Sequence, residues 1–73
     1  MEEREQFTKN FAEQVRLLRL AGHTQRELAR ELGIDENSIG DYCNGRSFPK
    51  IWLARKICVA LNCSYEELFG ELK

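Results

Sequence analysis

Several features that would assign the chain to a familiar class are scarce or missing. The 73 residues include one proline and three cysteines, and no apolar run approaches the about 20 residues of a membrane-spanning helix. The start, MEEREQF, is acidic where a signal peptide is basic. We therefore expect a cytoplasmic protein without a membrane segment. Three cysteines with no CxxC pair are typical of small, reduced core residues rather than of a disulfide framework.

An excess of one charge is also missing. Eleven basic and twelve acidic side chains give a net charge of −1, which lowers the expectation of polyanion binding without excluding it, because the distribution of charge matters more than its sum. The sequence shows no nucleophile–base set, no glycine-rich phosphate loop and no helical carboxylates at metal-binding spacing. We therefore expect no enzymatic activity, no metal, no cofactor and no small-molecule substrate.

Strand patterns are absent, whereas helical patterns recur along the chain. A first helix is predicted over residues 4–21, ended by Gly22. Its apolar residues follow spacings of four, four and three, an amphipathic stripe formed by Phe7, Phe11, Val15 and Leu18. Another helix, at about 50–61, follows Pro49. The side chains of this helix that are predicted to face the core are Ile51, Ala54, Ile57, Cys58 and Leu61.

Three further helices are predicted from the residues that precede them. Thr24, Asp35 and Ser64 are good N-caps, because their side-chain oxygens can accept hydrogen bonds from first-turn amides. Thr24 and Ser64 are each followed three residues later by glutamate, the spacing of a capping box. The predicted helices span 24–32, 35–44 and 64–69. The predicted fold class is therefore all-α, a compact five-helix bundle forming a single domain over residues 1–73.

Short motifs follow one another in a specific order along this framework. They are Thr24-Gln25, Leu28-Ala29, Leu32-Gly33, Asp35, Ser38-Ile39, Asn44-Gly45, Pro49, Ile57-Cys58-Val59-Ala60-Leu61 and Glu67-Leu68-Phe69. Through them, residues 11–69 resemble the Cro/repressor-type helix-turn-helix domains of phage and bacterial regulators. The resemblance implies a lambda-repressor-like fold with the helix-turn-helix at about 24–44, double-stranded DNA as partner, and a role in transcription regulation, with repression as the expected outcome.

The resemblance also implies a DNA-binding surface. In this family the second helix of the motif lies in the major groove, while the first crosses the backbone. The implied groove-facing residues are Glu36, Asn37, Gly40 and Asp41, with Ser38 near the backbone, and the implied phosphate contacts are Gln25, Arg46 and Lys50. Plainer roles stay open, because Glu36 can stabilise a helix N-terminus and the other charged residues can simply be solvated.

The charge distribution favours two different functions. Residues 24–45 carry five acidic and two basic side chains, whereas residues 46–56 carry four basic and no acidic ones. Carboxylates can accept from the cytosine amine, and asparagine can pair with adenine, so an acidic reading helix beside a basic rim is compatible with sequence-specific DNA binding. The alternative is a helix-turn-helix fold used as a protein–protein interaction module, with an acidic surface for a basic partner.

A homodimer is expected from the family's binding mode, because one such domain covers only a half-site of a two-fold operator. Exposed aromatic residues on a small domain commonly mark an interface. The predicted dimer surface comprises Phe48, Trp52, Phe69 and Leu72. The alternative for Trp52 is that it folds back over the core.

Overall fold

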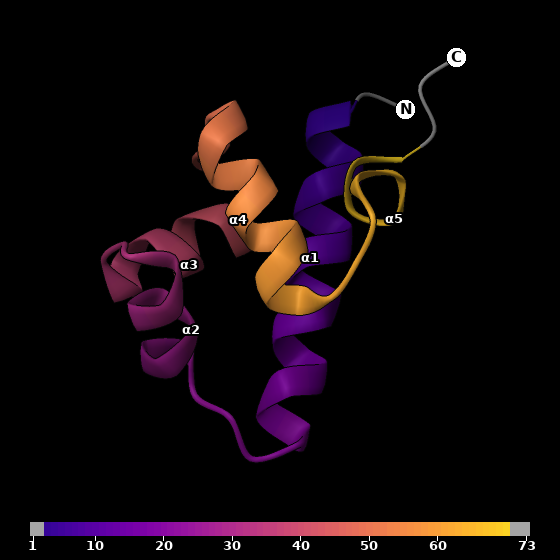
Figure 1. The fold of residues 1–73 in the computed structure, drawn as a ribbon. Coiled ribbons are helices and arrows are strands. Elements are labelled where there is room, and N and C mark those ends of the chain that lie inside the picture. Colours follow the sequence, from indigo (N-terminus) through magenta and orange to yellow (C-terminus); the bar gives the residue numbers. More distant parts are fainter. Residues whose placement is uncertain (1–2, 71–73) are drawn as a thin grey trace.

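The computed structural model describes residues 3–70, and within them it contains five helices and no strand. The helices are α1 (Glu3–Leu20), α2 (Gln25–Leu32), α3 (Glu36–Asn44), α4 (Ile51–Leu61) and α5 (Tyr65–Phe69). Figure 1 shows α1 as the long helix of the bundle, with α2 and α3 to one side of it, α5 to the other and α4 between them. The predicted all-α, five-helix fold is confirmed.

The predicted N-caps fix where three of the helices begin. The Thr24 hydroxyl accepts from the Glu27 N–H at 3.1 Å, while the Glu27 carboxylate accepts from the Thr24 N–H at 2.9 Å. Ser64 and Glu67 form the same reciprocal pair at 3.1 and 3.0 Å. The Asp35 carboxylate accepts from the Asn37 N–H at 2.9 Å. Both capping boxes and all three caps are therefore confirmed, because orphan first-turn amides receive a partner.

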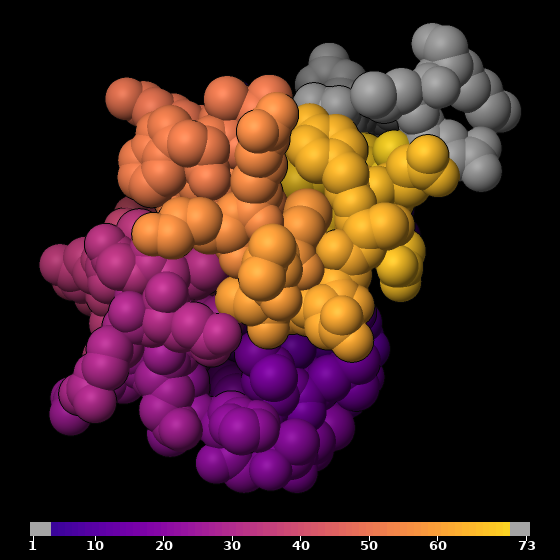
Figure 2. Space-filling model, in the orientation of Figure 1, coloured from indigo at the N-terminus to yellow at the C-terminus, as the bar shows by residue number. Residues whose placement is uncertain are grey.

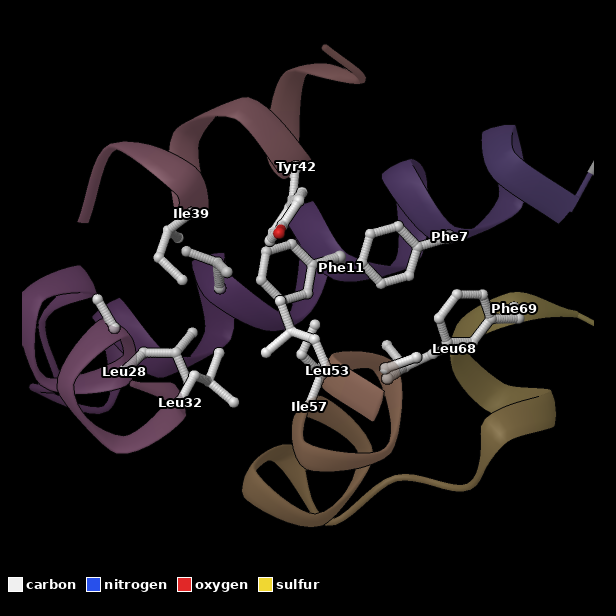
Figure 3. Packing of buried hydrophobic residues seen from close by; sticks show 13 residues of the cluster. Phe7, Phe11, Leu28, Leu32, Ile39, Tyr42, Leu53, Ile57, Leu68 and Phe69 are labelled. Atoms are coloured by element: carbon white, nitrogen blue, oxygen red, sulfur yellow. The ribbon is translucent and has the colours of Figure 1, made fainter. Parts of the chain in front are cut away.

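The core is built around the apolar stripe of α1. Phe7, Phe11 and Val15 are buried, and Leu18 packs against them, as predicted. The Phe7 ring lies 4.7 Å from that of Phe69 and 5.2 Å from that of Phe11, centroid to centroid, and Figure 3 shows the Phe7 and Phe69 rings between α1 and α5. The first half of α1 thus carries an aromatic cluster that holds α5.

A polar contact fixes the same two helices. The side-chain amide of Asn10 donates to the backbone carbonyls of Glu67 and Leu68 at 2.9 and 3.0 Å. These carbonyls belong to the end of a short helix, where they have no partner within the helix itself. Asn10 therefore satisfies the end of α5 while anchoring it to α1.

Two predictions about individual side chains are wrong. Ile51 was expected to face inward, but it is 68% exposed, and Leu53 occupies the core at 3% exposure. Phe69 was expected on an exposed dimer surface, but it is 2% exposed, because it stacks against Phe7 and against Tyr65. Leu72, the other C-terminal residue of that predicted surface, lies outside the described residues.

Candidate nucleic-acid interface

The α2–turn–α3 unit is closed by a glycine and a cap. Gly33 adopts a left-handed conformation (φ 72°) that a side chain would disfavour, and the Ile34 N–H donates to the Ala29 carbonyl at 2.9 Å. Asp35 then caps α3. Two helices are thereby joined through three residues, the short connection of a helix-turn-helix.

One face of α3 is anchored and the opposite face is open. Ile39 is fully buried, and Tyr42 packs edge-on against Phe7 and Phe11 of α1, with ring centroids 6.3 and 6.1 Å apart. Residues three apart share a helix face, so this anchor points residues 36, 37, 40, 41 and 44 away from the core. A Cβ built on Gly40 would meet nothing within 4 Å. The open face of α3 is therefore free to approach a partner closely.

All eight residues of the implied DNA-binding surface lie at the surface of the protein. Glu36, Asn37, Arg46 and Lys50 are exposed, whereas Gln25, Ser38, Gly40 and Asp41 are partly exposed. Glu36, Asn37, Ser38, Gly40 and Asp41 belong to α3, whereas Gln25 begins α2 and Lys50 is the N-cap residue of α4. Two of the eight residues, Gln25 and Lys50, thus stand at the beginnings of other helices, α2 and α4.

The starts of α2 and α3 meet in an open hollow. Its volume is about 470 Å³, and its polar lining joins the two helices to the end of α1: Arg19, Gly22, His23, Thr24, Gln25 and Glu36. A second hollow, of about 520 Å³, lies between α1, α2 and α4, where Figure 2 shows a recess in the surface. The first hollow places Gln25 next to Glu36, so these two implied contacts lie together.

Each charged residue within α3 has an arginine beside it. Arg26 Nε lies 3.6 Å from Glu36 Oε1, and Arg46 Nη1 lies 3.9 Å from Asp41 Oδ1. The two arginines come from outside α3, one from the first turn of α2 and the other from the loop after α3. Arg26 is not among the residues that the family resemblance implies for DNA binding. Its pairing with a residue ten positions away follows no helical spacing, so only the fold brings the two together.

Few ionisable groups near this surface have shifted pKa values. A hydrogen bond from the Thr24 backbone N–H, and a second from its hydroxyl, lower the pKa of Glu27. Burial raises the pKa of the Cys43 thiol, as it does for Tyr42. A raised thiol pKa keeps Cys43 protonated and unreactive at neutral pH, consistent with a packing role.

The predicted dimer surface is only partly exposed. Trp52 is 57% exposed and lies next to Ile51 at the start of α4, so the alternative of a tryptophan folded over the core is excluded. Phe48 is half-buried, and its ring packs edge-on against Phe7 and Phe69 at 5.5 and 5.7 Å. Among the described residues, the large hydrophobic side chains that are exposed are Ile51, Trp52 and Val59 on α4, and Leu17 and Leu20 near the end of α1.

Neither a membrane-crossing helix nor a metal-binding cluster is present in the part of the chain that the structure describes. No described helix has the length and apolarity needed to cross a membrane. Among residues 3–70, no group of three or more histidine, cysteine or carboxylate side chains is placed to hold a metal ion.

Comparison of the sequence with known protein families identifies the family of this chain. A family model described as a helix-turn-helix domain matches residues 10–70. The chain belongs to the helix-turn-helix family. Membership points to a DNA-binding regulatory protein rather than an enzyme.

A curated relative of this helix-turn-helix domain is Antitoxin PezA of Streptococcus pneumoniae serotype 4. It is 44% identical over 50 residues, which is 68% of this chain but 32% of the antitoxin. The chain thus spans about a third of that relative's length. No solved structure matches the chain.

Proposed function

We propose that this helix-turn-helix domain is a sequence-specific, DNA-binding transcriptional regulator of the Cro/repressor type, acting as a repressor in the cytoplasm. One observation carries the proposal: α3 is anchored by Ile39 and Tyr42 and presents a polar face with an arginine near each end. A helix held in this way can enter the major groove as a rigid unit, because its orientation is fixed from behind. The single domain expected over residues 1–73 is part of the same proposal.

Bases would be read from the open face of α3. Asn37, which is exposed in the first turn, can bond the N6 and N7 atoms of adenine together, while Glu36 and Asp41 can accept from the cytosine amine. Gly40 lets the helix come close to the base edges, since it carries no side chain and nothing covers it.

The backbone would be held from around α3. Gln25 stands at the N-terminus of α2, where helix amides and the helix dipole favour a phosphate. Ser38 lies within α3 close to its N-terminus, and Arg46 and Lys50 supply positive charge after it. Contacts of this kind orient the protein on the duplex without reading its sequence.

We also propose that two copies act on a two-fold operator. One α3 reads only one half-site, and half-sites about one helical turn apart require a symmetric pair. With Phe69 buried, the interface would centre on Trp52 and Ile51, since both expose most of their apolar surface at the start of α4. Phe48, which is half-buried beside them in sequence, would contribute at its rim.

A second candidate function is a protein-interaction module. Two observations favour it: the relative is called an antitoxin, and residues 24–45 sum to −3, from five acidic and two basic side chains. An acidic α3 surface would then bind a basic protein partner rather than DNA.

Selection of DNA fragments by the purified protein separates the two. We expect a defined motif to be enriched from genomic fragments, with a preferred adenine lost in Asn37→Ala. The Arg46→Ala/Lys50→Ala variant should weaken binding to all sequences alike and lower the salt slope by about one per lost contact. The control, Arg16→Ala, removes a positive charge from α1, outside this basic segment, and should keep the wild-type motif and most of its affinity. No enrichment of any motif would favour the protein-interaction module.

A further inference from the structure

Both charged side chains of α3 are engaged by arginines that start outside it. Arg26 reaches Glu36 from α2, and Arg46 reaches back to Asp41 from the following loop. A third ion pair of the described residues, between Arg16 and Glu13 at 2.6 Å, lies within α1. The two pairs at α3 therefore neutralise the acidic reading helix with groups from its two flanks.

The position of Arg26 in the fold favours a phosphate contact. Arg26 lies in the first turn of α2, next to Gln25, where unpaired helix amides and the helix dipole attract an anion. In a helix-turn-helix the helix before the reading helix crosses the DNA backbone, so an exposed cation at its N-terminus can lie close to a phosphate. Arg46, in the loop after α3, flanks the same helix from its other end.

The pairs are weak enough to be exchanged. The side chains of Arg26 and Arg46 are 77% and 75% exposed, and their N–O distances of 3.6 and 3.9 Å are long for charge-assisted hydrogen bonds. Exposed pairs of this kind contribute little, whereas a guanidinium can hold a phosphate with two parallel hydrogen bonds. A phosphate close to Arg26 can therefore take the place of Glu36.

We propose that Arg26 is a further phosphate-binding residue, and that Glu36 is an internal competitor that a phosphate must displace from it. This inference rests on the proposed DNA-binding function. Displacement leaves the Glu36 carboxylate unpaired beside a polyanion, a penalty that applies on every sequence. Only a site that offers a donor, such as the cytosine amine, compensates the carboxylate. Glu36 thereby lowers affinity for non-specific DNA more than for the correct site, and Asp41 acts on Arg46 in the same way.

A double-mutant cycle on non-specific DNA tests the exchange. Wild type, Arg26→Ala, Glu36→Gln and the double variant would be titrated against a fluorescent mixed-sequence duplex of about 20 base pairs at several salt concentrations. Arg26→Ala should weaken binding and reduce the salt slope by about one. Glu36→Gln should tighten binding about two- to fivefold, the range expected when an exposed pair is released. The gain from Glu36→Gln should be smaller in the Arg26→Ala background.

Controls separate this exchange from general charge effects. Glu13→Gln makes the same charge change and also frees an arginine, but on α1, so it should tighten binding less than Glu36→Gln does. Thermal melts should show all five proteins folded. A wild type that binds DNA while Arg26→Ala keeps its affinity and slope overturns this inference alone, as do equal gains from Glu36→Gln in both backgrounds. If none of the proteins binds DNA, the proposed function fails as well.

Discussion

The N-cap of α3 allows stability and DNA affinity to be changed separately. The Asp35 carboxylate does two things at once: it accepts from the Asn37 N–H at 2.9 Å, and it places a negative charge beside the proposed base-reading face. Asp35→Ala removes both the acceptor and the charge. Asp35→Asn removes the charge alone, because an asparagine oxygen caps a helix about as well.

The size of the effect follows from the cap. Losing an N-cap acceptor lowers the free energy of unfolding by about 1 kcal/mol, with a range of about 0.5–2. A domain of 73 residues has only about 4–11 kcal/mol in total, and about 1 kcal/mol corresponds to about 4–8 °C in Tm at this size. Asp35→Asn should lose only the interaction of the charge with the helix dipole, about 0.3–1 kcal/mol at an exposed site and less as salt is added.

Urea denaturation, followed by the circular dichroism of the helices, measures stability. Titration of a non-specific duplex measures DNA affinity. Asp35→Ala should be clearly destabilised and Asp35→Asn nearly as stable as wild type, yet both should bind the duplex more tightly, because both remove a charge that repels phosphate. Ser64→Ala is the matched control: it removes a similar cap from α5 and should lower stability without tightening DNA binding. Equal destabilisation by both Asp35 variants would refute the capping argument, and unchanged affinity in both would refute the electrostatic one.

Three further outcomes are expected. Asn10→Ala should lower the free energy of unfolding by about 1–2 kcal/mol in urea, because two carbonyls at the end of α5 lose their donor. A change as small as that of Gln6→Ala, which removes the hydrogen bond from Gln6 to Asn10, would contradict this. The pKa of Glu27 is lowered by its hydrogen bonds from Thr24, so its capping box contributes stability above the ordinary glutamate pKa and loses it as pH falls through the lowered value. The free energy of unfolding, measured from pH 7 down into the acid range, should therefore fall more steeply for wild type than for Glu27→Gln, which lacks this carboxylate. Trp52→Ala should stay folded but lose cooperative loading of two proteins on a selected operator in sedimentation equilibrium; unchanged cooperativity would exclude Trp52 from the interface.

The helix boundaries were predictable because they depend on local chemistry. A cap such as Thr24 or Ser64 lies within one turn of its glutamate. Both partners of the interaction can therefore be identified from their spacing in the sequence. The α1 stripe was equally readable, since Phe7, Phe11, Val15 and Leu18 recur at helical spacing and therefore share one face.

The buried face of α4 was not predictable in the same way. Its sequence, IWLARKICVAL, is apolar nearly all round, so helical periodicity fits either Ile51 or Leu53 as the first core residue. Contacts from other helices decide the choice in favour of Leu53. Phe69 shows the same limitation over a longer range, because its burial depends on Phe7, sixty-two positions earlier.

The candidate site was predictable as a set of positions but not as an electrostatic arrangement. The family pattern identified the residues of α3 and its flanks, and the structure places all eight at the surface. What the pattern could not contain is that Glu36 and Asp41 are each met by an arginine, since the partners are set by the angle between α2 and α3 and by the loop after α3. The role of each residue in binding stays a prediction.

These pairs change the meaning of the negative charge on residues 24–45. A sum of −3 suggests a surface that DNA avoids, but the field near α3 depends on where each charge lies, and the Glu36 and Asp41 carboxylates of α3 each have a guanidinium within 4 Å. A phosphate approaching this surface would meet exposed arginines at both ends of the helix and carboxylates between them. Affinity then depends on whether the bases offer donors to Glu36 and Asp41, because the arginines can reach phosphates on any sequence. An acidic reading helix between two arginines therefore favours discrimination between sequences over tight binding to all of them, and the relevant measurement is the ratio of specific to non-specific affinity rather than either value alone.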